Sequence, residues 1–254
     1  MKALSIKELT FDYPWKDPGD RLRPPLYQEL CLDVRAGEIT AVMGPSGCGK
    51  STLGKIVGDI VHPVSGRLFW EPTYEKGRHR VYMNQDPEKS IWDHQTVWQN
   101  VEWPLKQIGI PHSPRRAKIR TILEDVKLDA FARRVPRDLS GGQKSRLALA
   151  RQLAAEPRAI VLDECLNGLD LSTKEVIINV LSKRTQNPDS VTLFITHHAN
   201  EVLKLADRCL ILGNQRPVKI IADIRIDLPR PRDEDAPGYA GLQTELLKHL
   251  ANDF

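Results

Sequence analysis

A run of small and basic residues between positions 44 and 52 has the types and spacing that bind nucleotide phosphates. It consists of Gly44, Pro45, Ser46, Gly47, Cys48, Gly49, Lys50, Ser51 and Thr52, and it fits the pattern G-x-x-x-x-G-K-[ST]. Its glycines let the backbone turn tightly and bring N–H groups close to an anion. Lys50 supplies a point charge for the β- and γ-phosphate oxygens, and the Ser51 hydroxyl offers a ligand for Mg²⁺. A chance match is the alternative, but the pattern predicts a nucleotide-binding loop.

Two later stretches carry groups that could act on a bound phosphate. The apolar run 158–162 ends in two carboxylates, Asp163 and Glu164, and the apolar run 191–195 is followed by Thr196 and His197. Both runs have the composition of buried strands. The carboxylates could instead cap the following helix, and His197 could simply pack at the end of its strand.

Residues 139–143 form a second candidate anion site. Their order is Leu139, Ser140, Gly141, Gly142 and Gln143, directly before a predicted long helix. A serine and two adjacent glycines at a helix start place backbone N–H groups where anions bind. One chain rarely needs two phosphate cradles for one nucleotide, so this site would make sense if it served a nucleotide held by a second copy. A helix cap that contains glycine by accident is the alternative.

The elements that must position these groups follow from the hydrophobic pattern. Strands are expected over 3–9, 30–34, 38–43, 66–70 and 80–84, and a helix over 50–60. The phosphate loop thus lies between a strand and a helix, as its chemistry requires. We expect the strands around Ala36 and Gly37 to pair as a hairpin. The N-terminal region therefore mixes antiparallel strands with the core strand that leads to the loop.

The pattern is helical from about residue 87 to residue 155. Apolar residues recur at helical spacing at Val97, Val101, Leu105 and Ile108, and again at Ile119, Ile122, Leu123 and Val126 after the start signal Ser113-Pro114. Beyond this region, buried strands again alternate with helices, which implies a largely parallel sheet covered on both faces. The predicted fold class is α/β, with an antiparallel β subdomain and an inserted helical subdomain. Residues 239–254 predict a last amphipathic helix.

The bulk composition narrows the class of protein. The 254 residues suffice for a full hydrophobic core. The net charge of +4 and the pI near 8.8 are less basic than is typical of a domain that binds nucleic acid. No run of about 18 apolar residues and no apolar leader is present, so we expect a protein of the cytosol or of the cytosolic face of a membrane. The cysteines are Cys31, Cys48, Cys165 and Cys209. They lack C-x-x-C spacing and are expected to be reduced thiols.

The motif at 139–143 resembles the signature of the ATP-binding-cassette (ABC) ATPases, and the resemblance covers nearly the whole chain. The other motifs of that family occur in the family's order. Tyr13 matches the aromatic that stacks on adenine, with Trp15 as its nearest rival; residues 44–52 match Walker A, Gln85 the Q-loop, Asp163 and Glu164 Walker B, Asn167–Asp170 the D-loop, and His197 the switch histidine. The resemblance implies the P-loop NTPase fold of ABC type.

The same resemblance implies a division of the chain and a role for each motif. Residues 1–254 would form one ABC ATPase domain: a core over 1–86 and 156–227, a helical subdomain over 87–155, and a C-terminal tail and helix over 228–254. Tyr13 and residues 44–52 would bind ATP, and Mg²⁺ would be held by Ser51, Gln85 and Asp163. Glu164 would be the general base, assisted by Gln85 and His197. Ser140, Gly141, Gly142 and Gln143 would bind the ATP of the partner in a two-fold head-to-tail dimer.

Several positions depart from the usual family pattern. Cys165 stands where proline commonly follows the Walker B glutamate, and His198 stands where aspartate often follows the switch histidine. The D-loop reads Asn-Gly-Leu-Asp where Ser-Ala-Leu-Asp is usual. None of these changes removes a catalytic group. They bear on the rate and on communication through the D-loop.

The kind of ABC protein is indicated by two short stretches. Thr96–Val101 resembles the segment after the Q-loop in importer subunits, and Leu228–Asp233 is similar to the tail of the nitrate/sulfonate/taurine importer group. We expect a peripheral ATPase subunit on the cytoplasmic face of the inner membrane. Its partners would be a separate permease and, through the permease, a solute-binding protein. An exporter or lipoprotein-release ATPase and a non-transport ABC ATPase are the alternatives; no nucleic-acid partner is expected.

Overall fold

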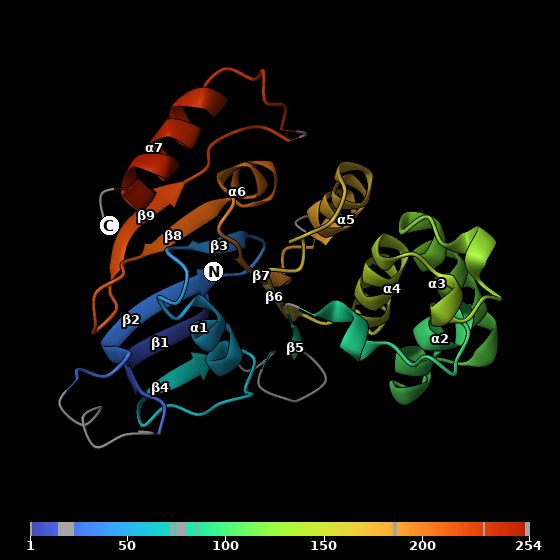
Figure 1. Cartoon of the computed structure of the whole chain (residues 1–254). Helices are drawn as coiled ribbons and strands as arrows, with labels where there is room; N and C mark the ends of the chain where they lie inside the picture. Colours follow the sequence, from blue (N-terminus) through green and yellow to red (C-terminus); the bar gives the residue numbers. More distant parts are fainter. Residues whose placement is uncertain are drawn as a thin grey trace.

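The computed structural model describes residues 2–14, 23–71, 74, 80–84, 86–184, 187–230 and 232–251. Within these residues the strands form two sheets, one of six strands and one of three, with helices packed around them (Figure 1). The predicted α/β class, with an antiparallel sheet and a separate group of helices, is confirmed. In this part of the chain no helix is both long enough and apolar enough to cross a bilayer.

The six-stranded sheet is the layer that positions the predicted chemical groups. Its order is β5-β6-β7-β3-β8-β9. The bounds are β3 Ile39–Met43, β5 Arg80–Met83, β6 Ala159–Asp163, β7 Val191–Ile195, β8 Arg208–Leu212 and β9 Ile220–Arg225. All these strands run parallel except β9, which is antiparallel to β8. Every residue of β3, β6 and β7 is buried. Burial on both faces explains why these strands are apolar runs rather than alternating patterns.

The three-stranded sheet overturns the expected hairpin around Ala36 and Gly37. It contains β1 (Lys2–Phe11), β2 (Tyr27–Arg35) and β4 (Ser65–Trp70), all antiparallel in the order β2-β1-β4. β2 pairs with β1, whereas β3 pairs with β7 and β8, so the two strands lie in different sheets. The turn at Gly37, with φ of 75°, carries the chain between the layers, and its N–H donates to the Ser190 carbonyl at 2.7 Å.

Two hydrophobic clusters hold the layers together. One lies between the two sheets around α1 (Lys50–Val57) and includes Val42 from the centre of β3. The other covers the opposite face, where Ala41 and Met43 of β3 point, and continues into the helical region. The alternation of side chains along β3 thus divides the molecule into two cores that share one sheet.

The helical region consists of α2, α3 and α4, which lie apart from α1 in Figure 1. Its bounds are α2 Val97–Gln107, α3 His112–Asp125 and α4 Gly141–Leu153, with short 3₁₀ turns at Pro87–Ser90, Asp129–Phe131 and Pro136–Asp138. Both predicted apolar faces are confirmed, since Val97, Val101 and Leu105 are buried in α2 and Ile119 and Leu123 in α3. α3 begins at His112, slightly before the expected Ser-Pro signal.

The remaining helices flank the second half of the sheet. They are α5 (Leu171–Arg184), α6 (Ala199–Leu205) and α7 (Tyr239–Ala251). α7 is the predicted last helix, and it packs on α6, where the Tyr239 hydroxyl reaches the Asn200 carbonyl at 3.5 Å. The finer division of the chain at residues 87, 155 and 228 remains a prediction.

Candidate active site

The carboxyl ends of β3, β6 and β7 meet at one edge of the six-stranded sheet. β3 leads directly into the phosphate loop, β6 ends at Asp163, and β7 is followed by Thr196 and His197. The register pairs Asp163 with Ile195 on β7. Ligands of open α/β sheets bind at the carboxyl ends of the strands. The fold therefore brings together three motifs that lie far apart in the sequence.

The phosphate loop has a shape that requires glycine at its join to α1. Gly49 has a φ of 104°, and a Cβ there would lie 2.7 Å from the Tyr27 hydroxyl oxygen. That hydroxyl donates a hydrogen bond of 2.8 Å to the Gly49 carbonyl. Burial raises the pKa of Tyr27, so its hydroxyl remains a donor at neutral pH. Tyr27 on β2 therefore supports the loop from the neighbouring sheet, a role that the sequence analysis missed.

Lys50 lies inside the loop rather than in solvent. Only 5% of its surface is exposed, and its Nζ donates to the carbonyls of Gly44 and Pro45 at 2.8 Å each. The N-terminus of α1 adds the positive end of its dipole at the same point. The adjoining cleft has a volume of about 260 Å³ and is lined by Ser46, Gly47, Gly49, Lys50, Ser51, Thr52 and Glu164. Its lining has the groups that bind a chain of phosphates.

Ser51 and Asp163 provide adjoining oxygen atoms next to this cleft. The Ser51 hydroxyl donates to Asp163 Oδ1 at 3.0 Å, and the Tyr82 hydroxyl donates to Asp163 Oδ2 at 2.7 Å. Burial, together with the bond to this carboxylate, holds the pKa of Tyr82 far above its ordinary value. Tyr82 on β5 thus stays a donor and fixes the orientation of Asp163. The sequence pattern marked β5 as a strand but gave no sign of this contact.

A hydroxyl beside a carboxylate suits Mg²⁺, which prefers oxygen ligands and binds through one or two carboxylates plus substrate phosphates. The described residues hold no group of three or more His, Cys, Asp and Glu side chains arranged to bind a metal ion by themselves. Ser51 and Asp163 are two adjoining oxygen ligands of the kind that Mg²⁺ prefers. The third expected ligand, Gln85, lies outside the described residues.

Glu164 and His197 face each other across the ends of β6 and β7. His197 Nδ1 lies 3.4 Å from Glu164 Oε1, and the two side chains are 44% and 16% exposed. The Glu164 backbone has a φ of 48°, which is rare outside glycine and costs about 1–3 kcal/mol. Its N–H donates to the Ile195 carbonyl at 2.9 Å. The strained backbone turns the carboxylate into the cleft.

Tyr13 lies beside the same helix start. Its hydroxyl is 3.0 Å from Thr52 Oγ1, its ring is 41% exposed, and Phe11 contacts the ring edge-on at a centroid distance of 5.1 Å. An exposed ring next to the phosphate loop can stack on a base. Trp15, the other candidate for the aromatic that stacks on adenine, lies outside the described residues.

A buried polar network behind His197 was not expected from the sequence. The Thr196 hydroxyl donates to Glu201 Oε2 at 2.6 Å, and Lys174 Nζ lies 2.8 Å from Glu201 Oε1. Glu201 is only 5% exposed, and Lys174 supplies the counter-charge to its carboxylate. The network links α5 after the D-loop to the end of β7 before His197. The sequence gives no local signal for this network, because Glu201 and Lys174 are distant in the chain.

The stretch 139–143 is not brought to the phosphate loop of its own chain. Ser140 caps α4, since its hydroxyl accepts from the Gln143 N–H at 3.3 Å and the Gln143 side chain accepts from the Ser140 N–H at 3.0 Å. Figure 1 shows α4 well separated from α1. A Cβ on Gly142 would lie 2.6 Å from Thr173 Oγ1, so the start of α5 packs closely against Gly142. The exposed start of α4 is free to face another molecule.

The departures from the family pattern leave the cleft intact. Cys165 is buried, and burial raises the pKa of its thiol to about 12. In the altered D-loop, Asp170 keeps the usual aspartate and caps α5 by accepting from the Thr173 N–H and hydroxyl at 3.0 and 2.8 Å. His198 precedes α6, with its ring centroid 4.0 Å from that of His197. None of these side chains occupies the phosphate cleft.

This combination of sheet, phosphate loop and flanking carboxylates defines a P-loop NTPase, and the additional antiparallel sheet and helical region are consistent with the ATP-binding-cassette class. A sequence model of the ABC transporter family matches residues 27–167. An uncharacterised ABC transporter ATP-binding protein of Methanocaldococcus jannaschii is 34% identical over 98% of this chain and 92% of that protein. The aliphatic sulfonates import ATP-binding protein of Agrobacterium fabrum is 36% identical over 98% of this chain and 83% of that protein. The chain therefore belongs to the ABC transporter family and is an ATPase of that family.

A solved structure agrees with this assignment. A dimeric ATP-binding cassette in a post-hydrolysis state, bound to ADP and Pi, matches with a TM-score of 0.74 at 25% identity. The match covers 89% of this chain and 100% of that cassette. Relatives of similar identity are named for import of nitrate, of molybdate or tungstate, and of spermidine or putrescine. Identity at this level therefore does not single out one solute.

Proposed function

We propose that this chain is the ATP-hydrolysing subunit of an importer that takes up a small solute through a separate permease. The observation that carries the ATP chemistry is the meeting of the phosphate loop, Asp163, Glu164 and His197 at one sheet edge. Import is supported by relatives named as import ATP-binding proteins, among them a sulfonate and a nitrate importer. A sulfonate, nitrate or taurine-like solute is the candidate class.

In this proposal the nucleotide binds across α1 and Tyr13. Lys50 exchanges its two loop carbonyls for β- and γ-phosphate oxygens, and the loop N–H groups hold the rest of the triphosphate. Tyr13 stacks on the adenine. Residues 44–52 have the geometry for this because Tyr27 fixes the loop from behind.

Ser51, Asp163 and Gln85 are proposed to hold the Mg²⁺ that accompanies ATP. Bound there, Mg²⁺ would neutralise charge on the phosphate oxygens. The hydroxyls of Tyr82 and Ser51 donate hydrogen bonds of 2.7 and 3.0 Å to the two carboxylate oxygens of Asp163. Its two oxygens thus keep one orientation before the nucleotide arrives.

Glu164 is proposed as the general base that polarises the attacking water. His197 would donate a hydrogen bond to the γ-phosphate, and Gln85 would orient the water beside the metal. The 3.4 Å approach of His197 Nδ1 to Glu164 Oε1 supports a shared site. The network of Thr196, Glu201 and Lys174 would hold this end of β7 in position.

A second copy of the chain would complete the site. Ser140, Gly141, Gly142 and Gln143 are exposed or half-buried at the start of α4 and lie far from their own phosphate loop. In a two-fold head-to-tail dimer they would bind the ATP of the partner. The dimeric cassette named above supports this arrangement. ATP would then link the two copies, and hydrolysis would release them.

The permease is proposed to dock beside α2. Trp92 and Trp103 contact each other there, with ring centroids 4.8 Å apart, and Trp103 is 43% exposed. Trp98 instead packs against the core. An exposed tryptophan that packs on a half-buried one suits a protein interface. This would place the chain on the cytoplasmic face of the inner membrane, and a solute-binding protein would reach it only through the permease.

Co-purification from native membranes in mild detergent tests the transport role. An importer subunit brings down a polytopic permease, and adding the isolated solute-binding protein together with its solute raises the ATPase rate of the complex. Recovery with a permease whose ATPase responds to no external binding protein would favour the exporter alternative. Recovery with soluble proteins alone would favour a non-transport role.

A further inference from the structure

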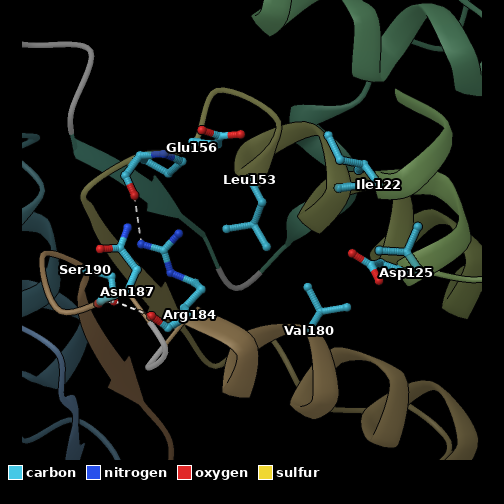
Figure 2. A pocket seen from close by; sticks show the side chains of 11 residues that line it. Ile122, Asp125, Leu153, Glu156, Val180, Arg184, Asn187 and Ser190 are labelled. Carbon is cyan, nitrogen blue, oxygen red and sulfur yellow. Dashed lines mark hydrogen bonds between the residues drawn. The ribbon is translucent and has the colours of Figure 1, made fainter. Parts of the chain in front are cut away.

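A cavity outside the candidate active site lies between α3, α4 and α5, and Figure 2 shows it from close by. Its volume is about 250 Å³, just below the roughly 300–1,000 Å³ typical of small-molecule pockets. The helical region supplies one wall and α5 with its following loop supplies the other. Neither the phosphate loop nor the start of α4 borders it. The cavity can therefore hold only a small molecule.

One part of the cavity is aliphatic. Ile122 of α3, Leu153 of α4 and Val180 of α5 surround it, and Ala150 completes the wall (Figure 2). These side chains offer no hydrogen bonds, so they favour a hydrocarbon body of matching size. One molecule bound in the cavity would therefore contact all three helices.

The charges that border the cavity do not balance. Asp125 is paired with Lys183, whose Nζ lies 2.5 Å from its Oδ1, and Glu156 is paired with Lys118. Both lining carboxylates are thus neutralised. Arg184, in contrast, has no carboxylate partner among the described residues, and its contacts are the Pro157 carbonyl at 2.8 Å and Thr192 Oγ1 at 3.5 Å. Within the part of the chain that the structure describes, Arg184 is therefore a cation of the cavity wall without a counter-charge.

The surroundings of Arg184 make this charge costly. Burial lowers the pKa of its guanidinium to about 10, with no opposing contribution from a nearby acid. Arg184 is partly buried, and a partly desolvated cation is stabilised when an anion pairs with it. A guanidinium also presents more N–H donors than the two that the described residues engage. A carboxylate or sulfonate that accepted the others would supply the missing charge and satisfy the free donors.

We propose that this cavity binds a small organic anion, with its acidic head on Arg184 and its aliphatic body between Ile122, Leu153 and Val180. An occupant contacts the helical region and α5 at once. Binding therefore stabilises the present arrangement of these helices against others that the chain can adopt. The site is separate from the nucleotide cleft and is loaded independently of ATP.

Calorimetric titration and thermal unfolding of the full chain test the proposal with four six-carbon probes. Hexanoate and hexanesulfonate carry the acidic head, whereas hexanol and hexylamine are the neutral and cationic controls. We expect both anions to bind and to raise the melting temperature more than hexanol does, and hexylamine not to bind. Arg184→Gln should weaken hexanoate binding about tenfold. Arg120→Gln removes an exposed arginine of α3 outside the cavity and should leave binding unchanged.

Two further variants keep the test decisive if Arg184→Gln folds poorly. Val180→Phe fills the aliphatic part and should abolish binding. Lys183→Gln leaves Asp125 unpaired beside the cavity and should weaken binding of both anions. ATP titration checks that each variant retains its fold. Equal binding of hexanol and hexanoate by the wild type, or unchanged hexanoate binding in Val180→Phe, would overturn the proposal.

Discussion

The Tyr82 hydroxyl donates a 2.7 Å hydrogen bond to Asp163 Oδ2, and this bond orients the carboxylate at the end of β6. The other carboxylate oxygen accepts from Ser51 at 3.0 Å. Asp163 is 2% exposed, so its two oxygens depend on these donors rather than on water. A tyrosine on the edge strand thus fixes a group that the phosphate loop also contacts.

Removing the Tyr82 hydroxyl should affect both stability and turnover. Tyr82→Phe should lower the free energy of unfolding by about 1–3 kcal/mol, because it leaves an oxygen of a buried carboxylate without a donor. ATP hydrolysis at limiting Mg²⁺ should fall roughly fivefold, which corresponds to about 1 kcal/mol. Tyr74→Phe is the matched control, because its hydroxyl bonds the Asp189 carbonyl at 2.7 Å away from the cleft. Equal Mg²⁺ dependence in the two variants would show that Tyr82 has only a structural role.

Lys50 should be indispensable for nucleotide binding. Lys50→Ala removes the charge that the loop encloses, and ATP affinity should fall at least about a hundredfold, equivalent to about 2.7 kcal/mol. Lys55→Ala, one turn further along α1, is the control and should retain wild-type affinity. Fluorescent-nucleotide titration measures both. Unchanged affinity in Lys50→Ala contradicts the assignment of residues 44–52.

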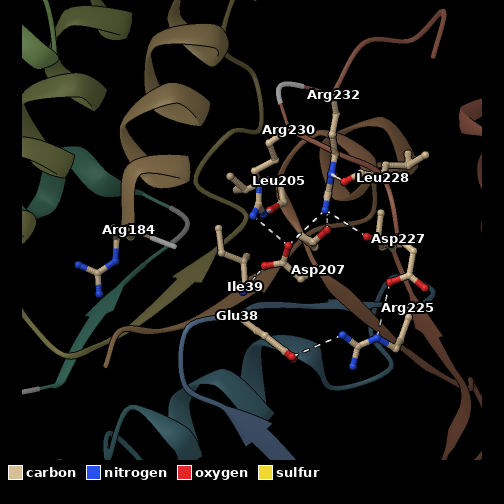
Figure 3. Close-up of polar contacts among 12 residues, drawn as sticks. Glu38, Ile39, Arg184, Leu205, Asp207, Arg225, Asp227, Leu228, Arg230 and Arg232 are labelled. Carbon is tan, nitrogen blue, oxygen red and sulfur yellow. Dashed lines mark hydrogen bonds and ion pairs between the residues drawn. The ribbon is translucent and has the colours of Figure 1, made fainter. Parts of the chain in front are cut away.

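Asp207 joins the C-terminal segment to the core (Figure 3). Its Oδ1 lies 2.9 Å from Arg230 Nη1 and 3.2 Å from Arg232 Nη2, and its Oδ2 accepts from the Ile39 N–H at 2.9 Å. The Arg232 side chain is 2% exposed and also donates to the Leu203 carbonyl at 3.0 Å. The arginines of the stretch 228–233 therefore tie the tail to the end of α6 and the start of β3.

Asp207→Asn should destabilise the fold by about 3–5 kcal/mol, because it leaves a buried arginine without its counter-charge. Asp227→Asn, whose side chain is 83% exposed, should change the free energy of unfolding by less than about 0.5 kcal/mol. Urea unfolding measures both variants. A small effect of Asp207→Asn would mean that backbone carbonyls alone hold Arg232.

The thiols should differ in their reactivity. Cys31 is exposed, whereas Cys48, Cys165 and Cys209 are buried. Burial raises the pKa of Cys165 to about 12 and that of Cys209 further, so both remain protonated as the pH rises from 7 to 9. A chromogenic disulfide reagent should therefore titrate one thiol quickly in the native protein, and Cys31→Ser should remove that phase. Fast reaction of a second thiol at pH 9 would contradict the predicted burial.

The sequence analysis succeeded where short motifs fix local structure. The strand before residues 44–52, the helix after them, and the strands that end at Asp163 and just before Thr196 were predicted correctly, because each depends on residues close together in the chain. The roles of the side chains at these places remain predictions. The sequence analysis failed at Gly37, because an apolar strand after a turn can join either of two sheets. It also missed Tyr27 and Tyr82, and the pairing of Glu201 with Lys174, because these partners lie far apart in the chain. Such contacts follow from the sheet order, which local patterns do not determine.

The central claim is that ATP is bound between two copies of the chain and that Glu164 starts its hydrolysis. Sizing chromatography of Glu164→Gln with ATP and Mg²⁺ tests it most directly. Glu175→Gln, an exposed change on α5, is the control. We predict that Glu164→Gln elutes as a stable dimer with ATP and as a monomer without it, while the control hydrolyses ATP and returns to monomer. A Glu164→Gln protein that binds ATP yet remains monomeric at every protein concentration would contradict the account.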